Sequence, residues 1–337
     1  MVHKEIRQVR RDRRTLAMMI VLPVMLLVVF GYAASFDVSA IEVALTNPST
    51  AQTSFALPPP FVEVDPIEAD PVEILRHNQA DVVIDGEQGD YVAFIDGSEL
   101  FTARAAVQAL TGAARQGAPI TIEILFNPEL DTSAVLVPGL AGLILIFIGS
   151  LVTSLGVVRE RQAGTLEQLA VMPLRPRDVF IGKIAPYFLV ATVDLVVVLF
   201  VGWLLFDVPF VGSAWVLGLG SILFLFVTLG VGVLISTVSE NQGQAIQLAI
   251  MTLLPQVLLS GLIFPLESMA PGVRWIGYLL PLTYFNQIAR GVMLKGAPFE
   301  ALAVPLALLA GLGVAVFGLA VLRFRSELGV SKEGATP

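Results

Sequence analysis

Six separate runs of apolar residues, each about as long as a bilayer is thick, constrain this chain more than any other feature. A hydrocarbon core about 30 Å thick is spanned by about 20 helical residues. The first run, 15–34, has no charged side chain, and Pro23 inside it is tolerated in a spanning helix. The predicted spans are 15–34, 134–158, 184–206, 214–237, 245–264 and 299–322. We therefore expect a polytopic α-helical membrane protein with six transmembrane helices.

Composition supports the same class and excludes several kinds of site. Apolar residues make up 55% of the 337 residues and charged residues 14%, whereas soluble domains have about 45–50% and about 25%. The absence of cysteine excludes disulfides and thiolate metal sites, and two histidines, His3 and His77, are too few for a histidine-rich metal site. The chain has no phosphate-binding loop and no hydrolase or metalloprotease motif. We predict no catalytic residue, no metal site and no nucleic-acid partner.

Basic residues predict the orientation of the spans. Residues 1–14 contain six Lys or Arg, 159–183 contain five, and the tail 323–337 contains three. With six spans these segments fall on one side, which the positive-inside rule makes the cytoplasm. Both termini are then cytoplasmic, and residues 35–133 face outward. Residues 2–14 also set Ile6 and Val9 against arginines, which predicts either a basic amphipathic helix on the inner surface or a simple topology signal.

The outward segment, 35–133, has the pattern of a folded α/β domain. Strands are predicted at 41–46, 81–85, 91–96 and 120–126, and helices at 72–78 and from an N-cap at Ser98 to Arg115. The proline-rich stretch 56–71 is predicted to be a loop. The segment contains sixteen Asp or Glu and three Arg. This acidic excess favours a solvated outer domain over a cation site.

The segment 265–297 is an exception to the charge rule, because it should lie outside but carries Arg274, Arg290 and Lys295. Proline and glycine interrupt it, and Trp275 and Tyr278 suit a membrane interface. We predict two short helices that dip into the membrane from outside and return. The side chains of Arg290 and Lys295 are expected to snorkel to lipid headgroups.

The loop 159–183 is the most informative part of the chain. Thr165 and Gln168 have capping-box spacing, which predicts a short helix from Thr165 that ends at Pro173. Leu166 and Leu169 share one face of that helix. The predicted product is a compact pair of short helices under the membrane. It suits either docking of a cytoplasmic partner or a basic interfacial loop that only sets topology.

One acidic residue lies inside a predicted span. Asp194 is about ten residues into the third span, where a charge costs about 2.5–3.5 kcal/mol on insertion scales. It must face protein, water or a partner, or carry a proton. A functional polar site and a structural hydrogen bond to a neighbouring span both remain open.

The motifs of the 159–187 region resemble those of the integral-membrane subunits of type-2 ATP-binding-cassette (ABC) transporters. Further similarity lies at Arg11 to Arg13, at Asn127 to Glu129 with Val137 to Gly139, and at Pro281 to Tyr284 with Arg290 and Gly291. The residues that carry the main match are Glu160, Arg161, Gly164, Thr165, Leu166, Glu167, Gln168, Leu169, Pro173, Gly182, Lys183, Pro186 and Tyr187. The similarity extends over nearly the whole chain, and it indicates the subfamily with a large extracytoplasmic domain between spans one and two.

The resemblance implies that this chain is one of the two permease chains of a transporter in the inner membrane of a bacterium. Two permeases, as a homodimer or with a sibling chain, would combine with two separate ATPase subunits that hold ATP and Mg²⁺, and this chain would bind no cofactor. Residues 1–14 would form a connecting helix and 265–297 re-entrant outer helices. The ATPase would contact the coupling segment Glu160, Arg161, Gly164, Thr165, Leu166, Glu167, Gln168, Leu169, Met172 and Pro173.

The expected function is ATP-driven export of a hydrophobic or amphipathic substrate, because the spans carry few polar residues besides Asp194, Gln244 and Gln247. Two other readings are open. A membrane-anchored sensor or assembly factor would act through the outer domain. A secondary transporter would use Asp194 as an ion site, but that class predicts inverted repeats, which the sequence does not show.

Overall fold

The computed structural model describes residues 40–46, 59–65, 69–87, 90–164 and 176–333, with Val38 and Leu57 as single residues. Within these ranges the side chains of 176–184, 324–333, Glu87, Asp90 and Glu267 are not described. The predicted connecting helix, 1–14, and the first predicted span, 15–34, therefore lie outside the described residues. So do residues 165–175 of the loop.

The described part of the N-terminal third forms a five-stranded sheet in the order β2-β1-β3-β4-β5. β1 pairs in parallel with β2 and β3, β3 is antiparallel to β4, and β4 is parallel to β5. We call this sheet and its two helices the α/β module. Its elements are β1 Ile41–Leu45, β2 Phe61–Glu63, α3 Pro71–Arg76, β3 Val82–Glu87, β4 Asp90–Asp96, α4 Leu100–Arg115 and β5 Ile120–Leu125.

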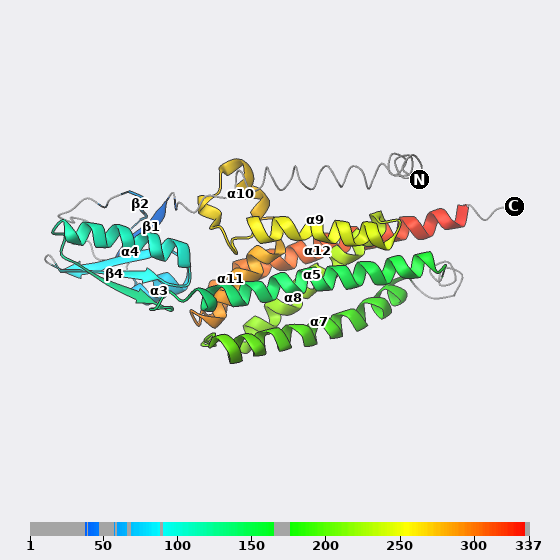
Figure 1. The fold of residues 1–337 in the computed structure, drawn as a ribbon, viewed down its shortest axis with the longest axis horizontal. Coiled ribbons are helices and arrows are strands. Elements are labelled where there is room, and N and C mark those ends of the chain that lie inside the picture. The colour runs from blue at the N-terminus through cyan, green and yellow to red at the C-terminus, as the bar shows by residue number, and fades with distance from the viewer. Residues whose placement is uncertain are drawn as a thin grey trace, which may run out of the picture.

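Alternation along the strands sends successive side chains to two different helices. Val43 packs with Ala106 and Leu110 of α4, whereas its neighbour Ala44 packs with Ile74 of α3. Because successive residues of a strand point to opposite faces, each face of the sheet needs its own cover. The two helices supply these covers, and Figure 1 shows the resulting module at one end of the molecule.

Two local predictions for the module are wrong. A strand, β2, forms inside the stretch 56–71 that was predicted to be a loop, because Phe61–Glu63 pairs with the exposed edge of β1. Ser98 is not the N-cap of α4, whose cap residue is Glu99. The Ser98 hydroxyl instead donates to Asp96 Oδ1 at 2.7 Å. The turn that Ser98 forms places Asp96 and Glu99 at one edge of the module.

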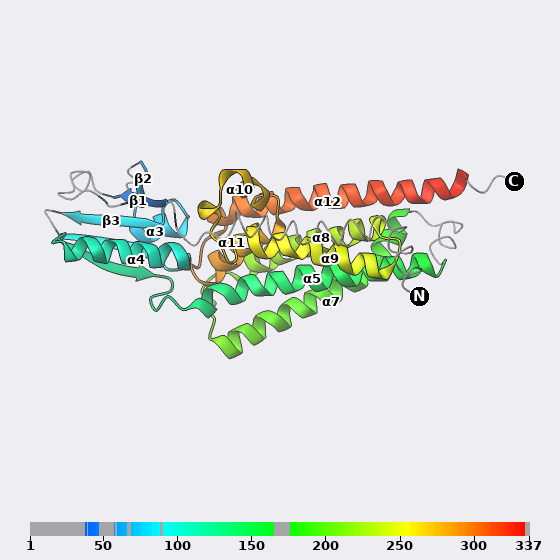
Figure 2. The same cartoon turned by 45° about the horizontal axis from the view of Figure 1, so that its top comes forward.

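The rest of the described chain is helical. The long helices lie side by side and extend from the module to the opposite end of the molecule (Figures 1 and 2). The elements are α5 Thr132–Gln162, α7 Pro176–Phe206, α8 Ala214–Val238, α9 Gln242–Leu259, η2 Leu266–Ser268, α10 Pro271–Gly277, α11 Pro281–Met293 and α12 Phe299–Glu333.

Four helices among the described residues are long and apolar enough to cross a membrane, namely Thr132–Gln162, Ala185–Phe206, Ala214–Val238 and Phe299–Arg323. They include the predicted spans two, three, four and six. α9 is not among them, and it ends at Leu259 instead of continuing to residue 264 as predicted. Gly261 has a φ of +79°, a conformation in which a right-handed helix cannot continue. The count of six spans stays a prediction.

Small residues allow the central helices of the bundle to approach each other closely. A Cβ atom on Gly232 of α8 would lie 2.8 Å from the backbone oxygen of Ser150 on α5, and one on Gly149 of α5 would lie 2.7 Å from Thr228. Close approach of backbones at small residues is the usual basis of helix association in membranes. α5 and α8 therefore form the tightly packed centre of the bundle.

α11 joins the bundle to the α/β module. All its residues except Gln287 are buried, and Phe285 stacks on Phe224 of α8 with ring centroids 4.5 Å apart. Figure 2 shows α11 between the sheet and the long helices. A helix so enclosed fixes the position of the module relative to the bundle.

Asp131 caps the helix that connects the module to the bundle, and its removal tests that cap. Its carboxylate accepts hydrogen bonds from the hydroxyl and backbone N–H of Ser133 at 2.8 and 3.1 Å. The Ser133 hydroxyl, followed by its backbone N–H, lowers the pKa of this exposed carboxyl below that of a free aspartate. We expect Asp131→Ala to destabilise the start of α5 by about 1 kcal/mol at neutral pH.

The pH dependence of that loss follows from the direction of the shift. A lowered folded pKa gives stability that is complete above the ordinary aspartate pKa and is lost as pH falls through the lowered value. Thermal unfolding of the wild type and of Asp131→Ala should thus differ at pH 7 and converge in strong acid. A difference that grew on acidification would contradict this assignment.

Candidate functional site

The described flanks of the loop, the end of α5 and the start of α7, lie at the opposite end of the long helices from the α/β module (Figures 1 and 2). α5 runs from the module end to Gln162, and α7 starts its return at Pro176. Two sets of functional candidates are therefore separated by the length of the bundle. We call them the loop end and the module end.

At the loop end, Arg161 ties α5 to α8. Its Nη1 donates to the backbone oxygens of Ser236 at 3.0 Å and Ser239 at 3.1 Å. These carbonyls belong to the C-terminal end of α8, where a cation is favourable because the helix dipole is negative there. Gln242 Nε2 also donates to Gln162 Oε1 at 3.2 Å. The start of the loop is thereby held against the turn between α8 and α9.

Gly164 follows α5 directly and ends its right-handed helical conformation. Its φ is +71°, and its N–H donates to the backbone oxygen of Arg161 at 3.1 Å. A Cβ atom at this position would meet nothing within 4 Å, so glycine is needed for the backbone conformation and not for space. Half-buried Glu160 lies one turn earlier. The remaining predicted coupling residues, Thr165, Leu166, Glu167, Gln168, Leu169, Met172 and Pro173, lie outside the described residues.

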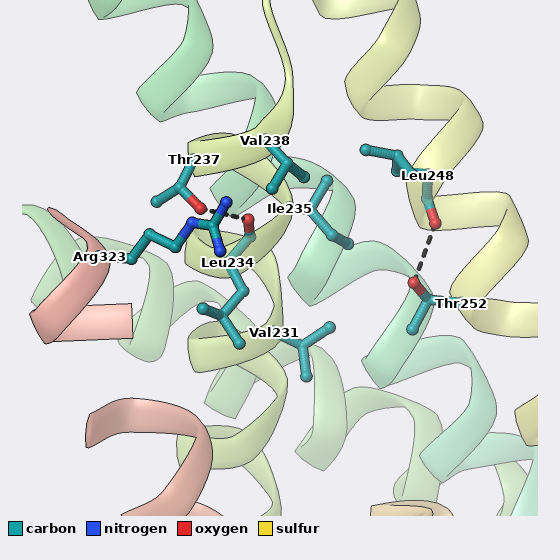
Figure 3. A pocket seen from close by; sticks show the side chains of 8 residues that line it. All are labelled: Val231, Leu234, Ile235, Thr237, Val238, Leu248, Thr252 and Arg323. Carbon is teal, nitrogen blue, oxygen red and sulfur yellow. Dashed lines mark hydrogen bonds between the residues drawn. The ribbon is translucent and has the colours of Figure 1, made fainter. Parts of the chain in front are cut away.

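A hollow of about 270 Å³ lies between α8, α9 and α12 near this end. Figure 3 shows Val231, Leu234 and Ile235 along its wall and Arg323 of α12 beside it. The hydroxyls of Thr237 and Thr252 donate to carbonyls of their own helices, at 2.7 and 2.9 Å. The hollow therefore offers a largely apolar surface, and it does not include the loop residues.

At the module end, the structure overturns the predicted role of two basic residues. Arg290 and Lys295 were expected to snorkel to lipid headgroups, but their side chains are 8% and 3% exposed. Arg290 Nη1 pairs with Glu99 Oε2 at 3.1 Å, and Nη2 donates to the Gly261 oxygen at 3.4 Å. The acidic module lies close enough to neutralise these charges, which removes any need to reach lipid.

Lys295 is held entirely by the module. Its ammonium pairs with Asp96 Oδ2 and donates to Asn78 Oδ1 and, at 3.0 Å, to the backbone oxygen of Leu75. Arg76 Nε in turn donates to the Lys295 oxygen at 3.1 Å. An ammonium has three donors, so these contacts satisfy it completely. We call the pairs Arg290–Glu99 and Lys295–Asp96 the junction ion pairs.

Sequence reasoning missed the junction ion pairs, although it contained a signal for them. The basic residues of 265–297 contradicted the charge rule, and residues 35–133 carried a net charge of −13. Opposite charges on these two segments favour contact between them. Which carboxylate meets which cation depends on the fold, because Glu99 and Arg290 are far apart in the chain.

The junction also encloses a cavity of about 440 Å³ between the module, α11 and the start of α12. Asp96, Glu99, Arg290 and Lys295 all line it, together with apolar residues such as Val304. Concave sites of roughly 300–1,000 Å³ are typical of small-molecule binding. The cavity is thus large enough for a drug-sized ligand.

Comparison with known proteins decides the family. A family model described as ABC-2 family transporter protein matches residues 13–322. The chain belongs to this ABC-2 transporter family. It is similar to the "Probable multidrug ABC transporter permease YbhS" of Escherichia coli strain K12, with 28% identity over 96% of both chains.

Other relatives agree with that assignment. YbhR of the same strain, also a "Probable multidrug ABC transporter permease", is 28% identical over 89% of this chain and 90% of its own. The "Inner membrane transport permease YhhJ" is 35% identical over 60% of this chain and 55% of its own. This chain is accordingly an ABC transporter permease, that is, a helical membrane protein that takes part in transport.

Asp194 is the one predicted intramembrane site of this ABC-2 permease that the structure describes. It lies on α7, and its Oδ2 is buried without a hydrogen-bond partner in the described part of the chain. Ala191 and Leu195, on neighbouring positions, pack into the core of the bundle. The other described side chains of α7, those of Ala185–Phe206, are mostly exposed and apolar, with 17% of the span buried. Asp194 therefore sits at the edge of the packed face of α7.

Proposed function

We propose that this ABC-2 permease is the transmembrane subunit of an exporter that moves a hydrophobic or amphipathic substrate outward. A separate ATPase subunit would dock on residues 160–173, hydrolyse ATP and pass a rigid-body movement to the helices. ATP and Mg²⁺ would be held by that subunit, and this chain would bind no cofactor. The observation that carries the proposal is the loop end, where Arg161 fastens the end of α5 to α8 and Gly164, directly after α5, has a left-handed backbone conformation.

This anchoring suits a coupling element. A force applied to the loop would act on α5 directly and on α8 through Arg161, and these two helices form the packed centre of the bundle. The names of two relatives, which describe probable multidrug permeases, support a cargo of drug-like size. The full assembly would contain two ATPase subunits and a second permease, either another copy or a sibling chain, within lipid.

The proposed setting is the inner membrane of a bacterium. Six spans, with 15–34 as the first and α9 as the fifth, would place both termini in the cytoplasm and the α/β module outside. The loop end would then face the ATPase, while the module end and 265–297 would face the exterior. The opposite positions of loop and module support this arrangement.

The decisive experiment is purification of the tagged chain from its native membranes in mild detergent, followed by mass spectrometry. We expect an ATPase with a phosphate-binding loop in comparable amount, and we expect its loss when 160–173 is scrambled. Scrambling 47–56, in the segment between spans one and two, is the matched control and should retain the ATPase. Retention of the ATPase by the 160–173 variant would refute the docking site.

Asp194 tests whether an ion-coupled mechanism operates instead. If energy enters at the loop end, Asp194→Asn keeps the shape and polarity of the side chain, and ATP-driven transport into vesicles should stay within about twofold of wild type. If Asp194 carried a coupling proton or cation, the variant would be inactive and transport would respond to a pH gradient. The matched control is Asp207→Asn, which lies just beyond α7.

A further inference from the structure

All three tryptophans of the chain are more than half exposed, and all come from elements at the module end. Trp203 near the end of α7 is 52% exposed, Trp215 in the first turn of α8 is 75% exposed, and Trp275 in α10 is 58% exposed. Tyr278 at the end of α10 and Phe299, the first residue of α12, are exposed as well. Large aromatic side chains left open in this number indicate contact with a membrane or with another protein.

Contacts between the elements bring these side chains to one level of the molecule. The connection between α7 and α8 meets the end of α11, since the N–H of Val211 donates to the last residue of α11 at 3.1 Å. A Cβ atom on Gly296 would lie 3.2 Å from Val211, and α12 begins just after, at Phe299. A Cβ atom on Gly277 of α10 would lie 2.5 Å from the oxygen of Leu259, the last residue of α9. We call the exposed aromatic residues of this level the aromatic belt, namely Trp203, Phe206, Trp215, Trp275, Tyr278 and Phe299.

The connection between α7 and α8 is itself apolar. Asp207 is the only charged residue of 207–213, whereas Phe210 and Val211 are apolar and exposed. A loop that faces water is normally polar, because exposed apolar side chains in a row gain nothing there. The apolar tip therefore continues the apolar surface of α7 and does not end it.

The length of the spans agrees with a membrane boundary at the aromatic belt. Ala185–Phe206 has 22 residues, which makes it about 33 Å long at 1.5 Å per residue, close to the roughly 30 Å of a hydrocarbon core. With one boundary at Phe206 the other falls near Ala185, and Lys183 stands just before it in the sequence. The span Phe299–Arg323 likewise begins in the belt and ends at a basic residue.

The two sides of the bundle distinguish lipid from a protein partner. α7 and α10 lie on opposite sides of the bundle in both views (Figures 1 and 2). A partner protein that docked on one side would leave the tryptophans of the other side in water. Lipid surrounds the whole molecule, and tryptophan and tyrosine suit its headgroup layer because each has an apolar ring and one polar hydrogen.

We propose that the aromatic belt binds the lipid headgroup layer on the module side of the membrane and fixes the depth of the protein there. α10, which the sequence predicted to dip into the membrane, then lies within this layer, and the tip between α7 and α8 stays in it too. The α/β module stands directly on the lipid surface. The inference goes beyond the proposed export function and needs neither the ATPase nor nucleotide.

The tryptophans of the chain report their own depth, because all three belong to the belt. The full chain is reconstituted into phosphatidylcholine vesicles whose acyl chains carry bromine either near the headgroup or near the middle of the bilayer, and quenching of tryptophan fluorescence is measured. We expect bromine near the headgroup to quench at least about twofold more than bromine near the middle. Each tryptophan kept alone, with the other two replaced by phenylalanine, should show the same preference.

Two reporter variants calibrate the measurement in the tryptophan-free background Trp203→Phe, Trp215→Phe and Trp275→Phe. Val196→Trp lies on α7, at a position about as exposed as Trp203 and about 10 Å deeper along the helix, so the deep bromine should quench it more. Val62→Trp lies on β2 of the module, at a half-exposed position, and dissolved iodide should quench it while neither bromine does.

Three results would overturn the proposal. Deep bromine that quenches the native tryptophans as strongly as shallow bromine would place the belt inside the hydrocarbon core. Iodide quenching equal to that of Val62→Trp, without bromine quenching, would place it in water. Quenching by neither agent would mean that another protein chain covers the belt. Failure of ATPase capture or of vesicle transport would count against the exporter function alone.

Discussion

Lys295→Met should destabilise the contact between the α/β module and α11 by about 3–5 kcal/mol, the usual cost of leaving one partner of a buried ion pair unpaired. Asp96 is 4% exposed, so water cannot replace the lost ammonium. The other contacts of Asp96, from the backbone N–H and the hydroxyl of Ser98, do not neutralise the charge of its carboxylate. Hydrogen exchange followed by mass spectrometry should show faster exchange in β4, α4 and α11, because the local opening free energy falls there.

Two further variants separate charge from packing. Lys295→Met combined with Asp96→Asn should recover most of the loss, since no buried charge is left unpaired and the amide oxygen still accepts from Ser98. Arg115→Met removes an exposed charge from the end of α4 and should leave exchange unchanged. Wild-type exchange rates in Lys295→Met would contradict the role assigned to the junction ion pairs.

Gly164→Pro should lower transport-linked ATP turnover about tenfold or more in the reconstituted complex. Proline fixes φ near −65° and has no N–H, whereas Gly164 needs a φ of +71° and donates to Arg161. The loop would then leave α5 in a different direction. Gly164→Ala keeps the donor and meets only the left-handed strain of roughly 1–2 kcal/mol, so its effect should be intermediate.

The chain supplies a closely matched control for this experiment. Gly117 also has a positive φ, +96°, its N–H also donates to the carbonyl three residues earlier, and a Cβ atom there also meets nothing within 4 Å. It lies in the module, at the opposite end from the loop. Gly117→Pro should therefore strain the fold similarly while coupling persists. Equal losses of ATP turnover in both variants would contradict a specific coupling role for Gly164.

Much of the secondary structure could be predicted from local pattern. β1, β4 and β5 agree with the predicted strands to within a residue, because alternation of apolar side chains is a short-range property. Four of the predicted spans also coincide with long apolar helices, although the helix Thr132–Gln162 extends beyond the predicted 134–158 at both ends. The strand β2 could not be predicted, since three residues in a proline-rich stretch become a strand only when the edge of β1 is available to them.

The candidate sites likewise combine features that the sequence predicts with features that only the structure shows. Glu160, Arg161 and Gly164 stood out by motif, but only the structure shows that Arg161 binds the end of α8. Arg290 and Lys295 were recognised as an exception to the charge rule and then assigned to lipid, wrongly. Their partners, Glu99 and Asp96, come from a segment nearly two hundred positions earlier, a separation that no local pattern reports.

The sequence by itself determined the membrane class, the long apolar helices and the family, because hydropathy and motif spacing are written along the chain. Tertiary structure alone decided which charges neutralise one another and where a cavity remains. Lys295 became a buried anchor and Asn286 an unsatisfied amide only when α11 was enclosed between the sheet and the bundle. The physical reason is that burial and pairing depend on distances between elements, and those distances exist only in the folded molecule.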